Sequence, residues 1–375
     1  MNRRIDIIQL LRGIAALLVC FFHMKALLNT SAMRYGTMLF GSGSIGVQIF
    51  FIISGFIMVY TTRKSDGTPH YVKNFLIKRL IRVVPLYYIM VLFWLVVYER
   101  SLSFFVEEPL TILKTFCFIP LFNSPLGPAY GMPPLKVGWS LNYEVLFYII
   151  FGLSLFLKRY RWTMLLVVFT TLVVFIPLIF KGYVNFIPSV NYDFKLSYFL
   201  LLTNPILIFF IVGVLLGLIY NSSFIIKSKV LQIVLVLISL VYFFLLYFRV
   251  SLFLNGFFIS MFSSTFLVFS LLLFNKGIGI RVPSFLVYLG DMSYSLYLVH
   301  PIVIIGLPSL LVFLKMGGVF NGKYYFLICT ACILLLSVIS YELIEKRLLK
   351  RAAIYLTSSD QKKIEVSLQP ELIEK

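Results

Sequence analysis

Residues 5–28 read I-D-I-I-Q-L-L-R-G-I-A-A-L-L-V-C-F-F-H-M-K-A-L-L, an apolar stretch interrupted by Arg12 and His23. Its length predicts a helix that crosses a lipid bilayer. Eleven residues make three helical turns plus about 20°, so Arg12 and His23 share one face, about 16 Å apart along the axis. An arginine in hydrocarbon costs about 2.5–3.5 kcal/mol on insertion scales. We therefore expect Arg12 to face a protein-lined interior.

The composition of the whole chain predicts the same class of protein. Of its 375 residues, 61% are hydrophobic and only 13% are charged, whereas a soluble domain is about half apolar and a quarter charged. The predicted fold is an all-α, polytopic membrane bundle of about ten transmembrane helices. The expected spans lie near residues 6–28, 44–62, 83–99, 139–157, 162–180, 199–220, 230–248, 254–274, 285–307 and 324–344.

The net charge of +19 follows membrane topology rather than nucleic-acid binding. With the N-terminus inside, 19 basic residues fall in inward segments and 9 in outward loops. This positive-inside bias predicts that both termini are cytoplasmic. Residues 1–350 are expected to form the transmembrane domain, and 351–375 a polar, disordered cytoplasmic tail. The outward segment 100–138, rich in proline and glycine, is expected to form an irregular lid or re-entrant loop.

Glu144 is a carboxylate inside the fourth expected span. Counted from the outer ends of their spans, Glu144 and His23 lie at similar depth. A carboxylate beside an imidazole orients the ring and favours its protonated form during proton transfer. We therefore predict that Glu144 pairs with His23, against the alternative of a structural glutamate paired with another donor.

The second expected span carries small residues, among them Gly46, Ser54 and Gly55, which allow close helix packing. After it come Lys78, Arg79 and Arg82. The two arginines are three residues apart and face the same way on a helix. They either anchor the chain to anionic lipid or grip phosphates bidentately, as a nucleotide-bearing cosubstrate requires.

A second histidine, His300, follows Tyr297 in the ninth expected span and precedes Pro301. The proline frees a backbone carbonyl that offers the ring a structural partner. A supporting or substrate-contacting role is the prediction for His300. Cys329 and Cys332 are expected to be small packing residues rather than a redox or metal pair.

Five motifs in this order resemble those of the bacterial membrane acyltransferase-3 family. They are Arg-x10-His in the first span, Gly-Val-x-x-Phe-Phe-x-x-Ser-Gly-Phe in the second, Arg-x-x-Arg before Pro-Leu-Tyr, Trp-Ser-Leu-x-x-Glu in the fourth, and Ser-Leu-Tyr-Leu-x-His-Pro in the ninth. The resemblance runs from about residue 6 to 345 and is strongest to exopolysaccharide O-acetyltransferases. Many relatives have two adjacent carboxylates after Trp-Ser-Leu, whereas here Tyr143 precedes Glu144.

The resemblance implies transfer of an acyl group, usually acetyl from acetyl-coenzyme A, to a hydroxyl of a cell-surface polysaccharide or lipid-linked oligosaccharide, in the bacterial inner membrane and without a metal. It implies catalytic roles for His23, Arg12 and Glu144, and coenzyme binding by Arg79, Arg82 and Lys78. Further residues in or beside the motifs are expected to contact substrate or support the site: Ser54, Tyr143, Asn142, Tyr148, Tyr297 and His300.

Two other classes of function remain open. A transporter or flippase for a lipid-linked sugar or small anion would use Arg12, Glu144 and His23 as substrate or proton sites. A structural scaffold in a polysaccharide-synthesis complex is a third possibility, but it does not explain why an arginine and a histidine lie within a membrane span. Within the transfer reaction, His23 is either the base that deprotonates the sugar hydroxyl or the carrier of an acyl group.

Overall fold

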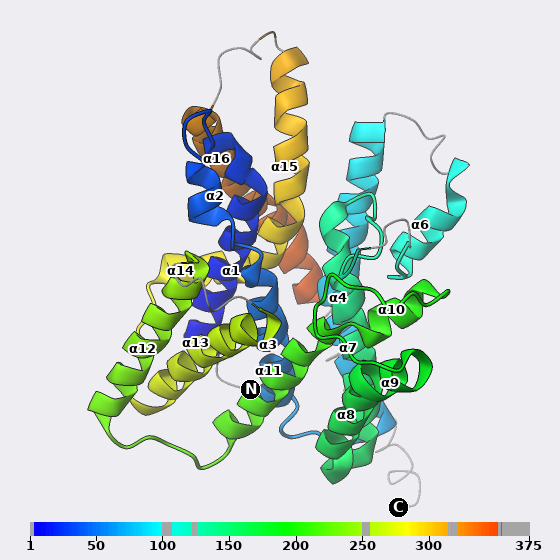
Figure 1. Cartoon of the computed structure of the whole chain (residues 1–375), viewed down its shortest axis with the longest axis vertical. Helices are drawn as coiled ribbons and strands as arrows, with labels where there is room; N and C mark the ends of the chain where they lie inside the picture. The colour runs from blue at the N-terminus through cyan, green and yellow to red at the C-terminus, as the bar shows by residue number, and fades with distance from the viewer. Residues whose placement is uncertain are drawn as a thin grey trace, which may run out of the picture.

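The computed structural model describes residues 4–99, 107–121, 126–249, 256–313, 315, 322–351 and 354. This part of the chain is helical and contains no strand. Figure 1 shows α1 (Asp6–Met24) and α3 (Ile45–Thr61) near the middle of a bundle, with α12 (Lys229–Tyr247) and α13 (Phe257–Gly277) on one side. The helices α4 (Pro69–Trp94), α7 (Trp139–Ser154) and α8 (Arg161–Thr170) lie on the other.

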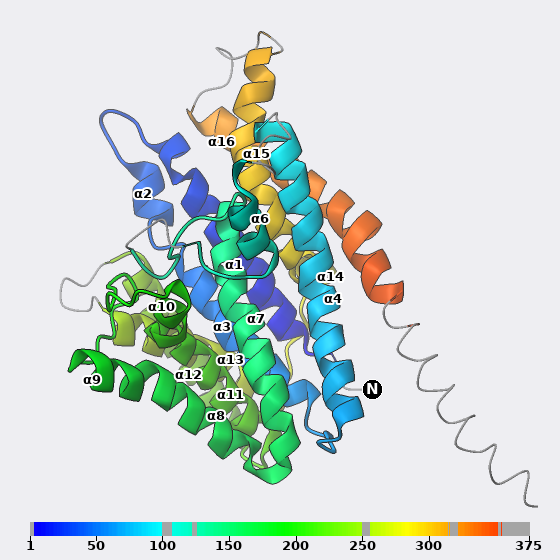
Figure 2. The same cartoon turned by 90° about the vertical axis from the view of Figure 1, so that its right-hand side faces the viewer.

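Further helices complete the described bundle. They are α2 (Tyr35–Phe40), α6 (Pro109–Phe116), α9 (Ile176–Lys181), α10 (Ser197–Thr203), α11 (Ile208–Asn221), α14 (Ser284–Asp291), α15 (Ser293–Phe313) and α16 (Gly322–Ser340). Figure 2, turned by 90°, shows α4 and α7 running lengthwise along the bundle. Single π-helical turns follow α4, α8 and α16, at Leu95–Glu99, Thr171–Phe175 and Tyr341–Glu345.

Seven helical stretches in the described residues are long and apolar enough to cross a membrane. One of them, Lys136–Lys181, is a single helical run that covers two of the expected spans. It bends at Lys158, whose backbone has φ 48° and ψ −108°, so α7 and α8 are separate rods. Another expected span falls on the shorter apolar stretch Pro205–Asn221. The all-helical membrane class is confirmed, whereas the count of ten spans and the side of each terminus remain predictions.

Glycines let the central helices approach closely. A Cβ on Gly46 would collide with the backbone oxygen of Ala15, and one on Gly55 with that of Phe210. The predicted packing role of these two glycines is thus confirmed: Gly46 brings α3 against α1, and Gly55 brings α3 against α11. The four cysteines are free.

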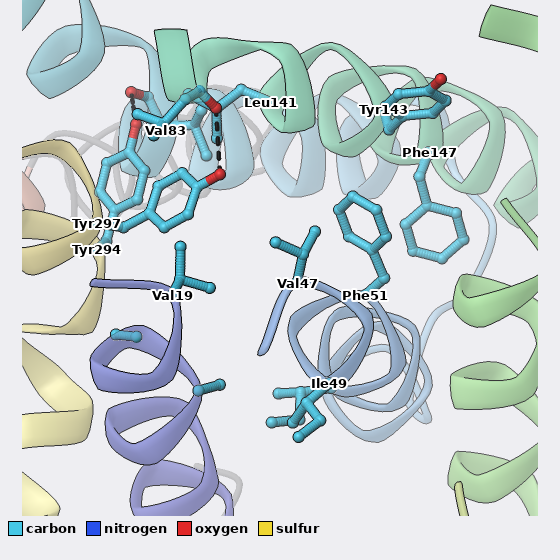
Figure 3. Packing of buried hydrophobic residues seen from close by; sticks show 14 of the residues in the cluster. Val19, Val47, Ile49, Phe51, Val83, Leu141, Tyr143, Phe147, Tyr294 and Tyr297 are labelled. Carbon is cyan, nitrogen blue, oxygen red and sulfur yellow. Dashed lines mark hydrogen bonds between the residues drawn. The ribbon is translucent and has the colours of Figure 1, made fainter. Parts of the chain in front are cut away.

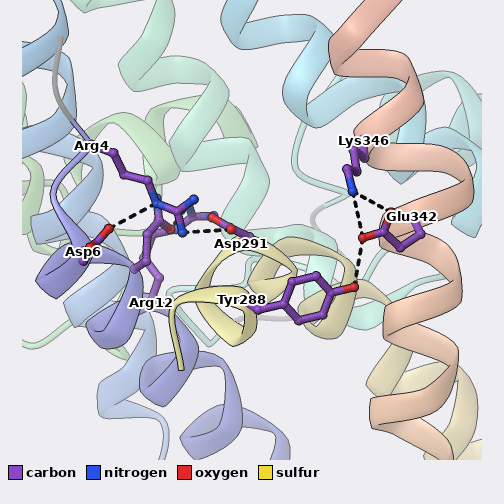
Figure 4. A network of polar contacts seen from close by, with 8 residues as sticks. Arg4, Asp6, Arg12, Tyr288, Asp291, Glu342 and Lys346 are labelled. Atoms are coloured by element: carbon purple, nitrogen blue, oxygen red, sulfur yellow. Dashed lines mark hydrogen bonds and ion pairs between the residues drawn. The ribbon is translucent and has the colours of Figure 1, made fainter. Parts of the chain in front are cut away.

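Charged residues link the start of α1 to α14 and α14 to the end of α16. Arg4 pairs with Asp291 at 2.8 Å, and the hydroxyl of Tyr288 donates to Glu342 at 3.1 Å. Figure 4 shows these contacts beside Arg12 on α1. The beginning of the first helix and the end of the last therefore lie at one end of the bundle.

The segment before α7 is only partly irregular, because it contains α6. Its later part is held to the bundle: Tyr143 donates to the backbone oxygen of Pro128 at 2.7 Å, and Asn204 donates to the hydroxyl of Tyr130 at 2.6 Å. Residues 100–106 and 122–125 lie outside the described residues. So does nearly all of the expected tail, residues 351–375, where only 351 and 354 are described.

Candidate active site

A narrow pocket lies between α1, α3, α4, α7 and α15. Its volume is about 70 Å³, room for about five water molecules or a slender chain. The residues with polar side chains that line it are Arg12, Ser54, Arg79, Arg82, Ser140, Glu144, Tyr148, Ser293, Tyr294 and Tyr297. The pocket therefore brings together residues from all five sequence motifs, the first and last of which lie more than 280 positions apart along the chain.

Three guanidinium groups face this pocket with few protein partners. Arg79 donates to the hydroxyl of Thr61 at 2.8 Å, and Arg12 donates to the side chain of Gln9 at 3.0 Å. In the described part of the chain, Arg79 Nε and the hydroxyls of Ser54 and Ser293 are buried without a hydrogen-bond partner. Buried polar groups are nearly always paired, so orphaned ones need an explanation. A polar, anionic ligand would satisfy them.

Glu144 lies in the same pocket as these arginines. Its carboxylate accepts a hydrogen bond from the hydroxyl of Tyr148, one helical turn further along α7. The predicted pairing of Glu144 with His23 is therefore wrong. Depth counted from the expected ends of two spans did not locate Glu144, which lies with Arg12, three helical turns from His23 along α1.

A second buried carboxylate, Glu345, was missed by the sequence analysis. It is 4% exposed, accepts from the hydroxyl of Ser295 at 2.7 Å, and interacts electrostatically with Arg12 and Arg82. It stands in the π-helical turn Tyr341–Glu345, a distortion that is frequent at functional sites. It lies at the end of the last expected span, next to Lys346 and Arg347, where charged side chains are usually exposed at the membrane interface, so nothing in the sequence indicates that it is buried.

His23 lies beside His300 instead of Glu144. The two imidazole rings have centroids 5.3 Å apart and planes 31° apart. His300 is fully buried and His23 is exposed. The Nδ1 atom of His300 lies 3.2 Å from the backbone oxygen of Leu296, while its Nε2 atom has no partner among the described residues. This contact fixes Nδ1 as the donor and leaves Nε2 as a free acceptor.

Tyr297 of α15 connects the histidine pair to the pocket, which Tyr294 of the same helix also lines. The ring of Tyr297 lies 5.8 Å from that of His300, and its hydroxyl is 2.8 Å from the hydroxyl of Ser140. Tyr294 donates to the backbone oxygen of Val83 at 2.7 Å. Figure 3 shows both side chains reaching toward Val83 and Leu141, with Val47 and Phe51 of α3 pointing toward α7. The pocket thus ends close to the histidines.

A family model described as an acyltransferase domain matches residues 5–342. The chain belongs to the acyltransferase-3 family. The match covers every helix that lines the pocket, so the pocket belongs to the acyltransferase domain itself.

Curated relatives match part of the chain. The exopolysaccharide production protein ExoZ of Rhizobium meliloti is 32% identical over 181 residues, which cover 48% of this chain and 51% of the relative. The peptidoglycan O-acetyltransferase OatA of Listeria monocytogenes is 31% identical over 163 residues, covering 40% of this chain and 24% of the relative. The chain thus aligns with about half or less of each relative's length. No solved structure matches it.

Three residues predicted from the acyltransferase-3 motifs lie apart from the pocket lining. Lys78 is exposed beside the paired arginines but does not line the pocket, because it points away on α4. Tyr143 is fully buried and holds Pro128, which is a supporting role. Asn142 is half-buried and does not line the pocket either. The structure brings together Arg12, Ser54, Arg79, Arg82, Glu144, Tyr148 and Tyr297 in one pocket, and His23 with His300 beside it.

Proposed function

We propose that this acyltransferase moves an acyl group, acetyl in the simplest case, from acyl-coenzyme A to a hydroxyl of a cell-surface or exported polysaccharide. The observation that carries the proposal is the pocket itself, where three arginines and unpartnered buried donors meet in an acyltransferase-3 domain. The relatives named for exopolysaccharide production and peptidoglycan O-acetylation support a glycan as the acceptor.

The shape of the pocket supports a donor with a thin reactive arm. About 70 Å³ is too little for a nucleotide but suits a slender chain that ends in a thioester. The guanidinium groups of Arg79 and Arg82 would hold negative charge at the α4 side. Arg12, which interacts electrostatically with Glu345, would hold the arm of the donor from the α1 side.

His23 is the proposed base. It is exposed, so a sugar hydroxyl can reach it, and the buried ring of His300 lies beside it. In the reaction, His23 would take the proton of the hydroxyl as the new carbon–oxygen bond forms. The carbon–sulfur bond breaks, and the proton that His23 accepted is passed to the leaving thiolate, which gives the free thiol and returns His23 to its neutral form. Glu144, bonded to Tyr148, would balance the charge of the arginines instead of orienting His23.

In this proposal the chain crosses a bacterial inner membrane about ten times with both termini in the cytoplasm. The arginine end of the pocket then faces the donor side, and His23 the acceptor side.

The test uses the purified full chain with acetyl-coenzyme A and a surface glycan. We expect free thiol to appear together with ester on the glycan. A transporter or flippase would release no thiol. If no glycan acceptor stimulates thiol release, that alternative is favoured.

A further inference from the structure

A second group of cavities lies on the other side of α3 from the pocket. One, of about 520 Å³, is bounded by α2, the end of α12 and the turn after α1; a neighbouring one, of about 170 Å³, reaches the start of α3. They share Gly41, Ser42, Tyr247 and Arg249, so we treat them as one outer cavity. It lies at the end of the bundle where α1 ends, two residues beyond His23.

Three cationic side chains from distant parts of the chain converge on the outer cavity. Lys25, Arg34 and Arg249 all line it, and no acidic residue does among the described residues. On the proposed orientation this is the outward face, where the positive-inside rule predicts few basic residues. Topology therefore does not explain why three of them gather at one hollow.

Two buried polar atoms in the outer cavity also lack partners. Tyr247 is only 6% exposed and lines both parts, yet its hydroxyl has no hydrogen-bond partner in the part of the chain described. The side-chain oxygen of Gln48 also has no partner among the described residues, but it is an acceptor and does not bind an anion. The unpartnered hydroxyl of Tyr247 beside converging cations indicates a built site for an anion.

The rim of the outer cavity is apolar and exposed. Met38 on α2 is 63% exposed, and Phe248 after α12 is 43% exposed. Cations bordered by exposed apolar side chains suit a ligand whose phosphate meets the cations while its hydrocarbon stays in the bilayer. A soluble glycan would not need this rim.

We propose that the outer cavity binds the phosphate headgroup of a lipid-linked glycan acceptor. This inference rests on the proposed function for the identity of the acceptor. Anchoring at Lys25 would hold the attached sugar near the end of α1, where His23 is exposed.

The binding test measures the affinity of the purified full chain, in neutral detergent and without acyl donor, for farnesyl diphosphate by native mass spectrometry. Inorganic diphosphate and dioctanoyl phosphatidylcholine are the comparison ligands. We expect farnesyl diphosphate to bind more tightly than either. Arg249→Gln should weaken it about tenfold, the size of one charge-assisted hydrogen bond, and Tyr247→Phe several-fold. Arg281→Gln, an exposed arginine elsewhere in the chain, is the matched control and should bind like the wild type.

If inorganic diphosphate binds as tightly as farnesyl diphosphate, the ligand is not a lipid. If the folded Arg249→Gln and Tyr247→Phe variants bind farnesyl diphosphate with the wild-type affinity, the outer cavity is not the binding site. The conservative Tyr247→Phe change keeps the test informative if Arg249→Gln does not fold. In the thiol-release assay, Arg249→Gln should raise the KM for the lipid-linked acceptor and leave that for acetyl-coenzyme A unchanged. If the probe binds but no thiol is released, the proposed function is contradicted and this inference is not. If thiol is released but the variants keep the wild-type probe affinity and acceptor KM, this inference is contradicted and the proposed function is not.

Discussion

The imidazole rings of His23 on α1 and His300 on α15 lie with their centroids 5.3 Å apart, the first exposed and the second fully buried. Because Nδ1 of His300 contacts the Leu296 carbonyl, its Nε2 is left as an acceptor without a partner among the described residues. A buried acceptor next to an exposed imidazole can position that imidazole and stabilise its protonated form. We therefore assign His300 a positioning role, which the first prediction tests.

His300→Leu should lower kcat about 10- to 100-fold, less than the roughly 10²–10⁴-fold effect of an acid or base itself, because His300 acts through His23, and the KM for the donor should not change. His300→Gln keeps a polar atom near the position of Nε2 and should recover part of kcat. If His300 served packing alone, leucine would be tolerated at least as well as glutamine. A kcat of His300→Leu equal to or above that of His300→Gln would therefore contradict the positioning role. Steady-state kinetics on both variants make the comparison.

His23→Ala should abolish O-acylation of the glycan, because it removes the proposed base, while the protein still inserts in the membrane. The measurement is the ester content of glycan from cells that carry only this variant, with membrane content of the protein as the control. Ester at the wild-type level would eliminate His23 as the base.

Arg79→Ala combined with Arg82→Ala should raise the KM for acyl-coenzyme A at least tenfold, since each charge-assisted hydrogen bond contributes about 1.5–3 kcal/mol. Lys78→Ala is the matched control: it removes one positive charge from the same helix, but its side chain is exposed and outside the pocket. Equal effects of the control and the double variant would mean that general surface charge, not the pocket, binds the donor.

Glu144→Gln should lower the thermal stability of the ligand-free protein, because it removes a negative charge beside Arg12 and Arg79 in a buried pocket. Uncompensated buried charge is costly, at about 3–5 kcal/mol when one partner of a pair is lost. Coenzyme A supplies negative charge, so it should raise the melting temperature of the variant by more than that of the wild type. Thermal unfolding in detergent, with and without coenzyme A, measures both effects. Identical ligand-induced shifts would show that Glu144 does not balance these arginines.

The sequence was sufficient for the all-helical membrane class and for most of the residues that meet in the pocket. Periodicity placed Arg12 on the same face of its helix as His23, and the cost of a charge in lipid predicted that Arg12 faces a protein-lined interior. The pairing of His23 was predicted wrongly because depth was counted from the expected ends of two spans, whereas Glu144 shares a pocket with Arg12, three helical turns from His23 along α1. His300, about 280 positions away, became the neighbour of His23 only through the packing of α15 on α1.

The bend at Lys158 was predictable, because Lys158, Arg159 and Arg161 interrupt the apolar run between two expected spans. Another feature depended on local geometry that composition does not encode. The π-helical turn at Tyr341–Glu345 turns Glu345 inward from a segment rich in basic residues. A buried carboxylate there could have been suspected only from the surplus of arginines elsewhere that needed compensation.

The narrowness of the pocket has a consequence for the order of events in turnover. A space of about 70 Å³ accommodates one slender arm at a time, so with the proposed donor the spent coenzyme must leave before the next donor enters. We therefore expect free coenzyme A and acyl-coenzyme A to compete for the pocket, and the ratio of the two in the cell, rather than the donor concentration alone, to set the rate of glycan modification.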